Sequence, residues 1–290
     1  MATSPDAGAF ARLDRSKFFA AIRPLFGKLT VAQVAGLNRL IDAFLLYALI
    51  LDRRHLAYIL ATSFHETGRR MQPVREGFAD STAQAISRLN AAWAAGKLKW
   101  VKTPYWRAGW FGRGDVQLTH EANYRGAIRD AVLKVFSIDI HADPDAVLRG
   151  DISAFVVIEG VTRGVTKRPD FTAFAIEDFL NATTTDYDNA RKSVNPGEKD
   201  SYRKVGDYAR RFEAALVAGG MPLTAARMPG ALGKAPASLP PTAPSSPPKV
   251  TPEPAPTGGL LRSGAQATGG AVRSGLAGLY DLIHTTFRRA

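Results

Sequence analysis

The chain of 290 residues contains no cysteine. Without thiols it can form neither a disulfide nor a thiolate metal site, which excludes disulfide scaffolds and cysteine-rich zinc modules. Stability must come from packing, and synthesis in a reducing cytoplasm is expected. Histidine is also scarce, with 5 residues spread along the sequence. We therefore expect neither a metal site nor any other cofactor.

Long apolar runs are also missing. The longest covers residues 43–51, closed by Asp42 and Asp52. A membrane-spanning helix needs about 20 apolar residues, so this run predicts a buried core helix instead. Residues 1–13 include Asp6 and lack the apolar segment of a secretory signal. We expect a protein that is cytoplasmic on synthesis and carries no signal peptide.

Charge is strongly biased to one sign. Lysine and arginine total 38 against 26 acidic residues, for a net charge of +12. Such a balance favours polyanionic partners, which include nucleic acid, anionic membranes and bacterial cell wall, although a solvated basic surface is the simpler alternative. Nucleic-acid binding predicts basic residues clustered on one element with interleaved aromatics, whereas here they are spread. We expect no nucleic-acid partner.

Apolar residues recur at helical spacing through most of the chain, and strand-like alternation is rare. Thr30 resembles an N-cap for the first helix. The fold class expected is mainly α, with long loops over 69–82, 97–116 and 181–200. Helices are expected over 31–44, 56–66, 83–95, 124–135, 152–160, 173–180 and 202–217.

Composition changes abruptly after the helical region. Residues 222–256 contain 11 of the 18 prolines, which is typical of a semi-rigid extended linker. We therefore divide the chain into a folded domain (1–221), a proline-rich linker (222–258) and a basic tail (259–290). The region from 222 onward contributes +5 of the net charge.

The tail has two interpretations. Five apolar residues fall on one helical face, which suits a short amphipathic helix on an anionic membrane or a partner; they are Val272, Leu276, Leu279, Ile283 and Phe287. Glycines throughout the tail disfavour a helix, and a frayed appendage is the alternative.

Several chemical motifs can be set aside. His65-Glu66 lacks the second histidine of a zinc-protease helix, because position 69 is arginine. Gly112-Arg113-Gly114 lacks the glycine pattern and the following lysine of a phosphate-binding loop. No serine lies in a recognisable nucleophile motif. What remains is a pair of carboxylates.

Glu66 and Glu76 are that pair. Hydrolysis of a glycosidic bond needs one carboxylic acid to protonate the leaving oxygen and a second carboxylate to activate water. Glu66 ends an apolar helix, where desolvation would raise its pKa as a general acid requires. Glu76 follows Pro73 on a loop, where we expect solvent exposure to keep it ionised. A surface acid at a helix end is the plain alternative for Glu66.

Four sequence blocks, in this order, resemble the chitinases and cell-wall lysins of glycoside hydrolase family 19. The resemblance covers roughly residues 15–218. The blocks are His65-Glu66-Thr67-Gly68; residues 71–77, which hold Glu76; Phe111-Gly112-Arg113-Gly114 through Gln117-Leu118-Thr119 to Asn123-Tyr124; and Tyr187 through Asn195.

The resemblance implies a lysozyme-like α-helical glycosidase domain with a catalytic cleft. Glu66 would be the general acid and Glu76 the base, with Asp80 as an alternative base and Thr119 holding the attacking water. The substrate-binding residues implied are Gln117, Asn123 and Asn195. We add Trp110, whose ring would offer an apolar face to a sugar. Arg113 is expected to brace its loop. The chain departs from the family where Asn195-Pro196-Gly197 replaces the usual Asn-Gly.

These expectations favour an inverting endolysin that cleaves β-1,4 bonds of peptidoglycan, like a muramidase, and reaches the cell wall after release from the cytoplasm. A chitinase acting on N-acetylglucosamine polymers is the first alternative. A non-catalytic binder of wall polysaccharide is the second. We expect a monomer.

Overall fold

The structure, a computed structural model, describes residues 10, 12–99, 101–164 and 170–225. The predicted linker lies outside these residues except for 222–225, and the predicted tail (259–290) lies wholly outside them. Neither the extended linker nor the amphipathic helix is therefore part of the fold described below.

The described part of the chain is mainly helical, as predicted. Its secondary structure comprises eight α-helices, five short 3₁₀ helices and four two-residue strands, and no helix in it is long and apolar enough to span a membrane. The α-helices are α2 (Arg15–Phe26), α3 (Val31–Tyr47), α4 (Arg53–Glu66), α5 (Thr82–Ala94), α6 (Glu121–Arg125), α7 (Ala127–Phe136), α8 (Gly150–Val161) and α9 (Lys199–Ala218).

The short elements connect these helices. The 3₁₀ helices are η1 (Glu76–Phe78), η2 (Tyr105–Ala108), η3 (Pro144–Leu148), η4 (Ile176–Asp178) and η5 (Asn189–Ser193). The strands form two antiparallel pairs: β1 (Leu51–Asp52) with β4 (Thr224–Ala225), and β2 (Val74–Arg75) with β3 (Arg113–Gly114).

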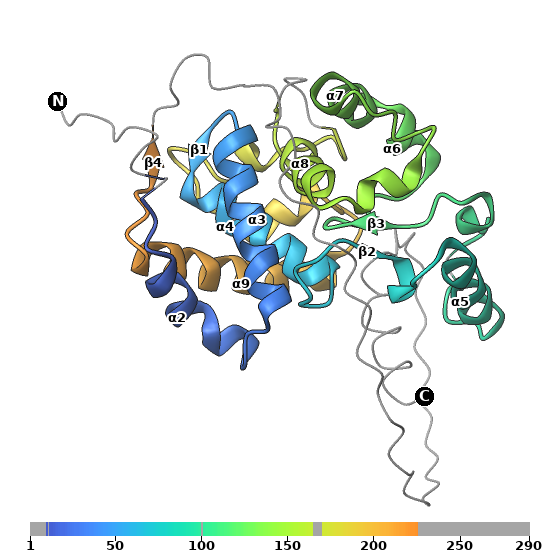
Figure 1. Ribbon diagram of the computed structural model, residues 1–290, viewed down its shortest axis with the longest axis horizontal. Helices are drawn as coiled ribbons and strands as arrows, with labels where there is room; N and C mark the ends of the chain where they lie inside the picture. The colour runs from blue at the N-terminus through green and yellow to red at the C-terminus, as the bar shows by residue number, and fades with distance from the viewer. Residues whose placement is uncertain (1–9, 11, 100, 165–169, 226–290) are drawn as a thin grey trace, which may run out of the picture.

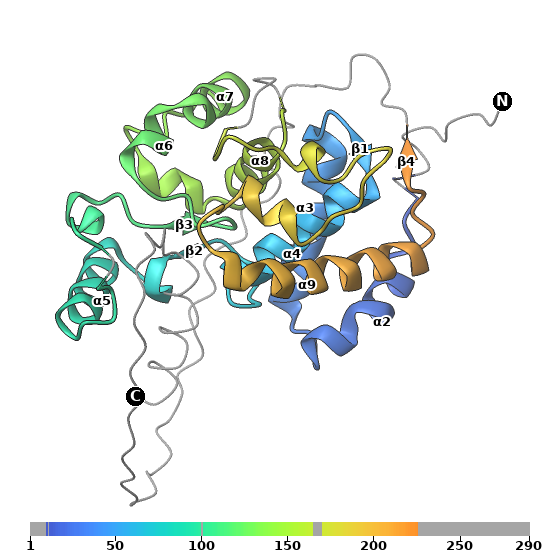
Figure 2. The ribbon, with the colours of Figure 1, turned by 180° about the vertical axis from the view of Figure 1, so that it is seen from behind.

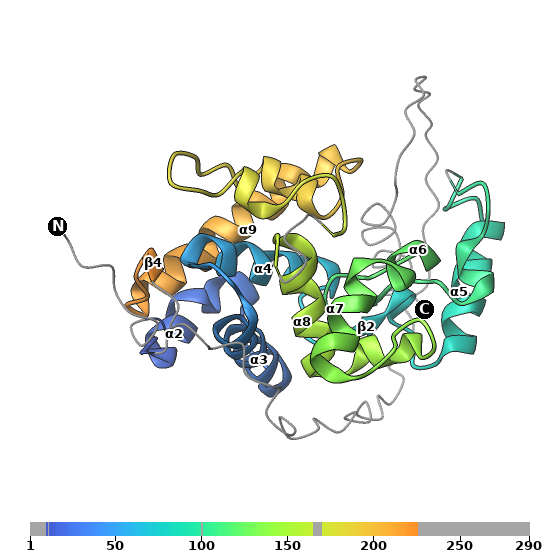
Figure 3. The same ribbon diagram turned by 90° about the horizontal axis from the view of Figure 1, so that it is seen from above.

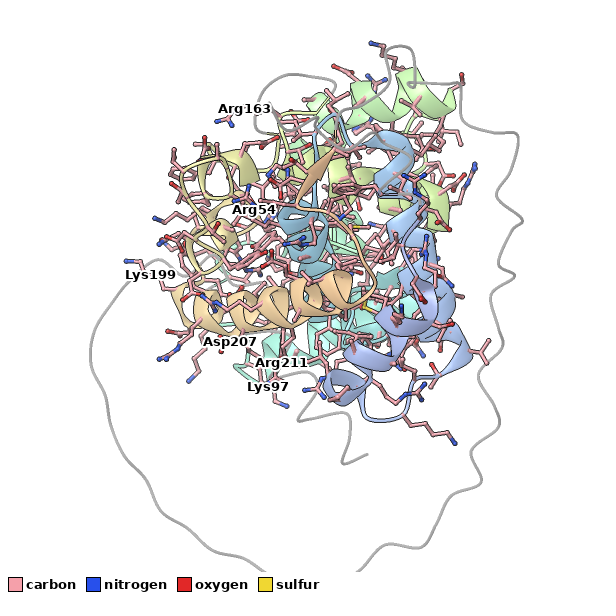
Figure 4. The ribbon with its side chains drawn as sticks, turned by 90° about the vertical axis from the view of Figure 1, so that its left-hand side faces the viewer. Arg54, Lys97, Arg163, Lys199, Asp207 and Arg211 are labelled. Atoms are coloured by element: carbon pink, nitrogen blue, oxygen red, sulfur yellow. The ribbon has the colours of Figure 1, made fainter. Side chains whose placement is uncertain are left out.

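Helix α4 is the centre of the larger part of the molecule. It is buried from Arg54 to Glu66 on every side, as befits a helix with no solvent face. Helix α9 packs along it, and α2 packs against α9 in turn, while α3 lies against α8 (Figures 1 and 2). The outer face of α9 is charged, and Lys199, Asp207 and Arg211 project from it (Figure 4).

A second, smaller core lies at the other end of the molecule. Helix α5 is at the opposite end from α2 (Figures 1 and 3). It packs with η1 and η2 around a separate hydrophobic cluster. Its buried residues are Ala79, Ala85, Leu89, Ala92, Leu98, Trp106 and Phe111. The sequence pattern did not distinguish the two cores.

Most predicted helices are confirmed. Helices α3, α4, α5, α8 and α9 match the expected ranges to within a few residues. Thr30 caps α3 with a full capping box, in which the Gln33 backbone N–H donates to Thr30 Oγ1 at 3.2 Å and the Thr30 backbone N–H donates to Gln33 Oε1 at 2.9 Å. This arrangement satisfies two backbone donors that the helix cannot pair internally.

Two expected helices are wrong, and one helix was not predicted. The range 124–135 is not one helix, because the extended backbone of Gly126 separates α6 from α7. The range 173–180 contains only the single turn η4, which the Asp178 carboxylate caps by accepting from the Ala175 backbone N–H at 2.9 Å. Helix α2 was not predicted, and Pro24 lies inside it.

A buried carboxylate joins four elements of the fold. Asp115, just after β3, is fully buried and pairs with both terminal nitrogens of Arg39 on α3, at 2.7 and 2.9 Å. It also accepts from the hydroxyls of Ser63 on α4, at 3.0 Å, and of Ser153 on α8, at 2.6 Å. Asp115 therefore fixes the segment after β3 against three helices at once.

Replacement of Asp115 tests this role. Asp115→Ala leaves the nearly buried Arg39 without its counter-charge, so we expect the free energy of unfolding to fall by about 3–5 kcal/mol. Asp42→Ala is the control, because Asp42 pairs with Arg15 while 53% exposed and should cost about 0–1 kcal/mol. Urea unfolding measures both. Equal losses of unfolding free energy in the two variants would show that Asp115 does not hold the segment after β3 against the three helices.

Candidate active site

Glu66 is the last residue of α4, and its burial follows from that position. The residue is 3% exposed. The chain turns sharply after it because Thr67 Oγ1 donates to the Ser63 carbonyl at 2.6 Å and accepts from the Met71 backbone N–H at 3.0 Å. This turn ends the helix and leaves the Glu66 carboxyl at its tip.

A fully buried guanidinium faces this carboxyl. Nη2 of Arg191, on η5, lies 2.7 Å from Glu66 Oε1 and 2.6 Å from Glu198 Oε2. Nε of Arg191 donates to Ser201 Oγ at 3.1 Å, at the start of α9. One arginine therefore connects the ends of α4 and η5 to the beginning of α9.

Burial raises the pKa of Glu66 above its ordinary value, and the charge of Glu198 adds to the rise, while Arg191 opposes it. Burial, aided by the charges of Arg191 and Lys204, holds the pKa of the neighbouring His65 well below its usual range. A neutral His65 adds no positive charge beside Glu66. The net result is a carboxyl that keeps its proton to a higher pH than an exposed glutamate does.

The loop after β3 contributes residues to the same site as Glu66. A tight turn closes it, with reciprocal backbone hydrogen bonds between Arg113 and Leu118 at 3.2 and 2.9 Å. Gln117 and His120 have φ angles of 53° and 70°, in the left-handed region. Such conformations cost roughly 1–3 kcal/mol each and concentrate at functional sites.

Neighbouring residues hold this conformation in place. Gln117 Nε2 donates to the carbonyls of Val74 and Gly114 at 2.9 and 3.2 Å. A Cβ at Gly112 would lie 2.8 Å from Gln117 Oε1 and 3.2 Å from Thr119 Oγ1, so any larger residue there would shift these two side chains. Arg113 braces the loop as expected, because its Nη1 donates to the carbonyls of Gly109 and Phe111.

One cavity contains five of the seven predicted site residues. It is open to solvent, and its empty volume, counted out into that solvent, is about 430 Å³. The predicted residues that line it are Glu66, Gln117, Thr119, Asn123 and Asn195, and the others are Val116, Leu118, His120, Phe171 and Val194. Segments more than 100 residues apart in sequence thus meet at one place.

Asn195 keeps a defined place despite the inserted proline. Its backbone N–H donates to the Arg191 carbonyl at 2.8 Å, and its side-chain oxygen accepts from the Gly197 backbone N–H at 3.3 Å. The turn after η5 therefore delivers Asn195 to the cavity. Elsewhere in the lining of the cavity, Asn123 Nδ2 donates to the Thr119 carbonyl at 2.6 Å.

Glu76 differs from its expectation. It does not line the cavity and is not exposed, since only 3% of it is accessible. Its oxygens accept from the Tyr105 hydroxyl and the Gly112 backbone N–H, each at 2.8 Å. Burial raises the pKa of Glu76, and the Gly112 N–H, the Tyr105 hydroxyl and Arg113 only partly offset this rise. Asp80, the alternative, is exposed.

Trp110 also lies outside the cavity lining. Its ring stacks on His141, with centroids 5.2 Å apart and planes 12° apart, and it contacts Tyr124 at 5.3 Å. The aromatic residue that does line the cavity is Phe171, which the sequence analysis did not identify.

Arg191 and Glu198 were also missed. Arg191 lies inside a segment that carries the family resemblance, but nothing in sequence shows that an arginine is buried. A fully buried arginine needs carboxylate partners, and these come from α4 and from the residue before α9. Only the packing of these elements reveals the group.

Comparison with protein-family models, with curated proteins and with solved structures finds no match to this chain. The cavity and its chemistry therefore carry the functional argument.

Replacement of Glu198 tests the electrostatics of the site. Glu198→Gln removes a negative charge that raises the pKa of Glu66, so that pKa should fall while Arg191 keeps an oxygen to bind. A carboxyl NMR titration, with the Glu66 signal assigned by its loss in Glu66→Gln, measures the change. Glu121→Gln, at a half-exposed pair with Arg125, is the control and should leave the Glu66 titration unchanged. A constant or higher pKa in Glu198→Gln would contradict this account.

Proposed function

We propose that this chain is a glycoside hydrolase that cleaves β-1,4 bonds of bacterial peptidoglycan by inverting acid–base catalysis. The observation that carries the proposal is a buried carboxyl of raised pKa, Glu66, in a cavity whose other polar residues are mainly amides and a hydroxyl. The four-block resemblance to glycoside hydrolase family 19 supports it, and a lysozyme-like domain is the fold proposed.

Glu66 protonates the leaving glycosidic oxygen. A general acid works best when its pKa is near the working pH, and burial moves the Glu66 pKa in that direction. Arg191 then stabilises the carboxylate that remains after proton transfer, since its Nη2 is already 2.7 Å from Glu66 Oε1.

Glu76 is the proposed base. Its raised pKa makes it a stronger proton acceptor than an exposed glutamate once it is ionised. A carboxylate has about four lone-pair sites, so the bonds from Tyr105 and Gly112 leave acceptor capacity for water. Thr119 Oγ1 donates to the Gln117 carbonyl, which leaves its own lone pairs to accept from a water in the cavity. Glu76 does not line the cavity, so its role as base requires its carboxyl to reach that water when the sugar is bound. Inversion requires carboxyls roughly 6.5–9.5 Å apart.

Gln117, Asn123 and Asn195 supply hydrogen bonds to sugar hydroxyl and acetamido groups. Peptidoglycan is the favoured substrate because a net charge of +12 attracts an anionic polymer. A chitinase is the second candidate, because no lysine or arginine is among the described residues that line the cavity. A neutral acetamido polymer fits such a lining equally well. The wall would be reached after release of the protein from the cytoplasm.

The first test compares wild type with Glu66→Gln on purified peptidoglycan and on soluble chitin oligosaccharides. We expect new reducing ends from peptidoglycan, and a kcat about 10²–10⁴-fold lower in Glu66→Gln because the acid is lost. Glu213→Gln, which replaces a carboxyl paired with Arg53 away from the cavity, is the matched control and should keep full activity.

The outcomes separate the candidates. Cleavage of chitin oligosaccharides alone would identify a chitinase. Binding without cleavage by the wild type would identify a non-catalytic wall binder. Cleavage that Glu66→Gln leaves intact would remove Glu66 from its proposed role.

The stereochemistry of the product is a separate test. Single displacement on a β-linkage should release the α-anomer first, which proton NMR detects before mutarotation equalises the two forms. Glu76→Gln should slow this step by about 10²–10⁴-fold as the base is lost. Initial release of the β-anomer would exclude the inverting mechanism and Glu76 as its base.

A further inference from the structure

The lining of the cavity combines polar and apolar side chains. Its amides and hydroxyl come from the loop after β3, from α6 and from the turn after η5, and they are Gln117, Thr119, Asn123 and Asn195. Its apolar lining consists of Val116, Leu118, Phe171 and Val194. Phe171 supplies the largest apolar surface of this set and is only partly buried.

The ring of Phe171 packs directly against Gly160 of helix α8. A Cβ at Gly160 on α8 would lie 1.9 Å from Phe171 Cζ and 2.2 and 2.3 Å from its two Cε atoms. Any side chain at position 160 would therefore push the ring away. Since the contact is made by the tip of the ring, the ring meets helix α8 end-on, and the same residue lines the cavity.

The backbone beside Phe171 is also fixed. Thr172 Oγ1 donates to the Lys192 carbonyl at 2.8 Å and accepts from the Phe174 backbone N–H at 3.0 Å. Lys192 follows Arg191 on η5. The loop that carries Phe171 is thus tied to the same short helix that holds the counter-charge of Glu66.

We propose that Phe171 is the stacking platform for the sugar unit bound beside Glu66. This inference rests on the proposed function and names the residue that positions its substrate. A β-1,4-linked N-acetylhexosamine carries its polar groups around the ring edge and C–H bonds on its flat faces. A flat aromatic surface suits such a face, while the amides of the cavity suit the edge.

The test measures steady-state kinetics of the full chain on solubilised peptidoglycan strands and on the tetramer of N-acetylglucosamine. Phe171→Ala should raise KM about tenfold, equivalent to about 1.4 kcal/mol of binding, with kcat within about twofold of wild type. Phe171→Leu keeps an apolar side chain but removes the flat ring, so KM should rise as in Phe171→Ala. Phe174→Ala is the matched control, since Phe174 is 38% exposed and lies outside the cavity lining.

Gly160→Ala is an independent test of the position of the ring. The variant keeps Phe171, but the added methyl group takes the space that its ring occupies. It should raise KM as Phe171→Ala does, and thermal unfolding checks that both variants remain folded. A rise in KM shared by Phe171→Ala, Phe171→Leu and Gly160→Ala, with kcat kept, would support the platform.

Two results would overturn the platform while the proposed function stands. One is wild-type KM in Phe171→Ala. The other is a loss of kcat and stability in Phe171→Ala that Phe171→Leu repairs together with KM, which would indicate a structural role only. If wild type cleaves neither polymer, the proposed function fails and the platform fails with it.

Discussion

The burial of one guanidinium organises the larger part of this molecule. Arg191 is fully buried, and a charge removed from water is tolerated only with close counter-charges and hydrogen bonds. Glu66, Glu198 and Ser201 supply them, so α4, η5 and the start of α9 must meet at one point. The same contact sets the electrostatics of Glu66. Arg191 therefore both connects these elements and lowers the pKa of Glu66 against the effect of burial.

Asp115 plays the complementary part in the segment after β3, as a buried anion that binds Arg39 and two serine hydroxyls. Ser63 lies on the last turn of α4 and Asp115 lies in the loop that carries Gln117 and Thr119. Arg191 and Asp115 thus connect η5 and this loop to the same end of α4. The strained backbone at Gln117 and His120 persists because this framework leaves it no alternative.

Sequence predicted most of the helices because those signals are local, whereas Gln117, Thr119, Asn123 and Asn195 were named only through the resemblance to glycoside hydrolase family 19. The capping box at Thr30 and the apolar pattern of α4 are readable without tertiary contacts. Glu76 was misjudged because its burial depends on Tyr105 and Gly112, which are distant in sequence. Phe171 was missed for the same reason, since its ring packs against Gly160 on helix α8, which is distant in sequence. The range 173–180 has apolar residues at helical spacing, but side-chain caps there satisfy the backbone in a single turn.

The presence of two hydrophobic cores has a consequence for how this protein responds to heat. Glu66 belongs to the large core, whereas Tyr105, which binds Glu76, packs against the small one around α5. Small clusters with few buried side chains open at a lower free energy than the body of a domain. The relative position of the Glu66 and Glu76 carboxyls therefore depends on the stability of the small core around α5. Warming would separate the acids while most of the helical structure, and its circular dichroism, persisted.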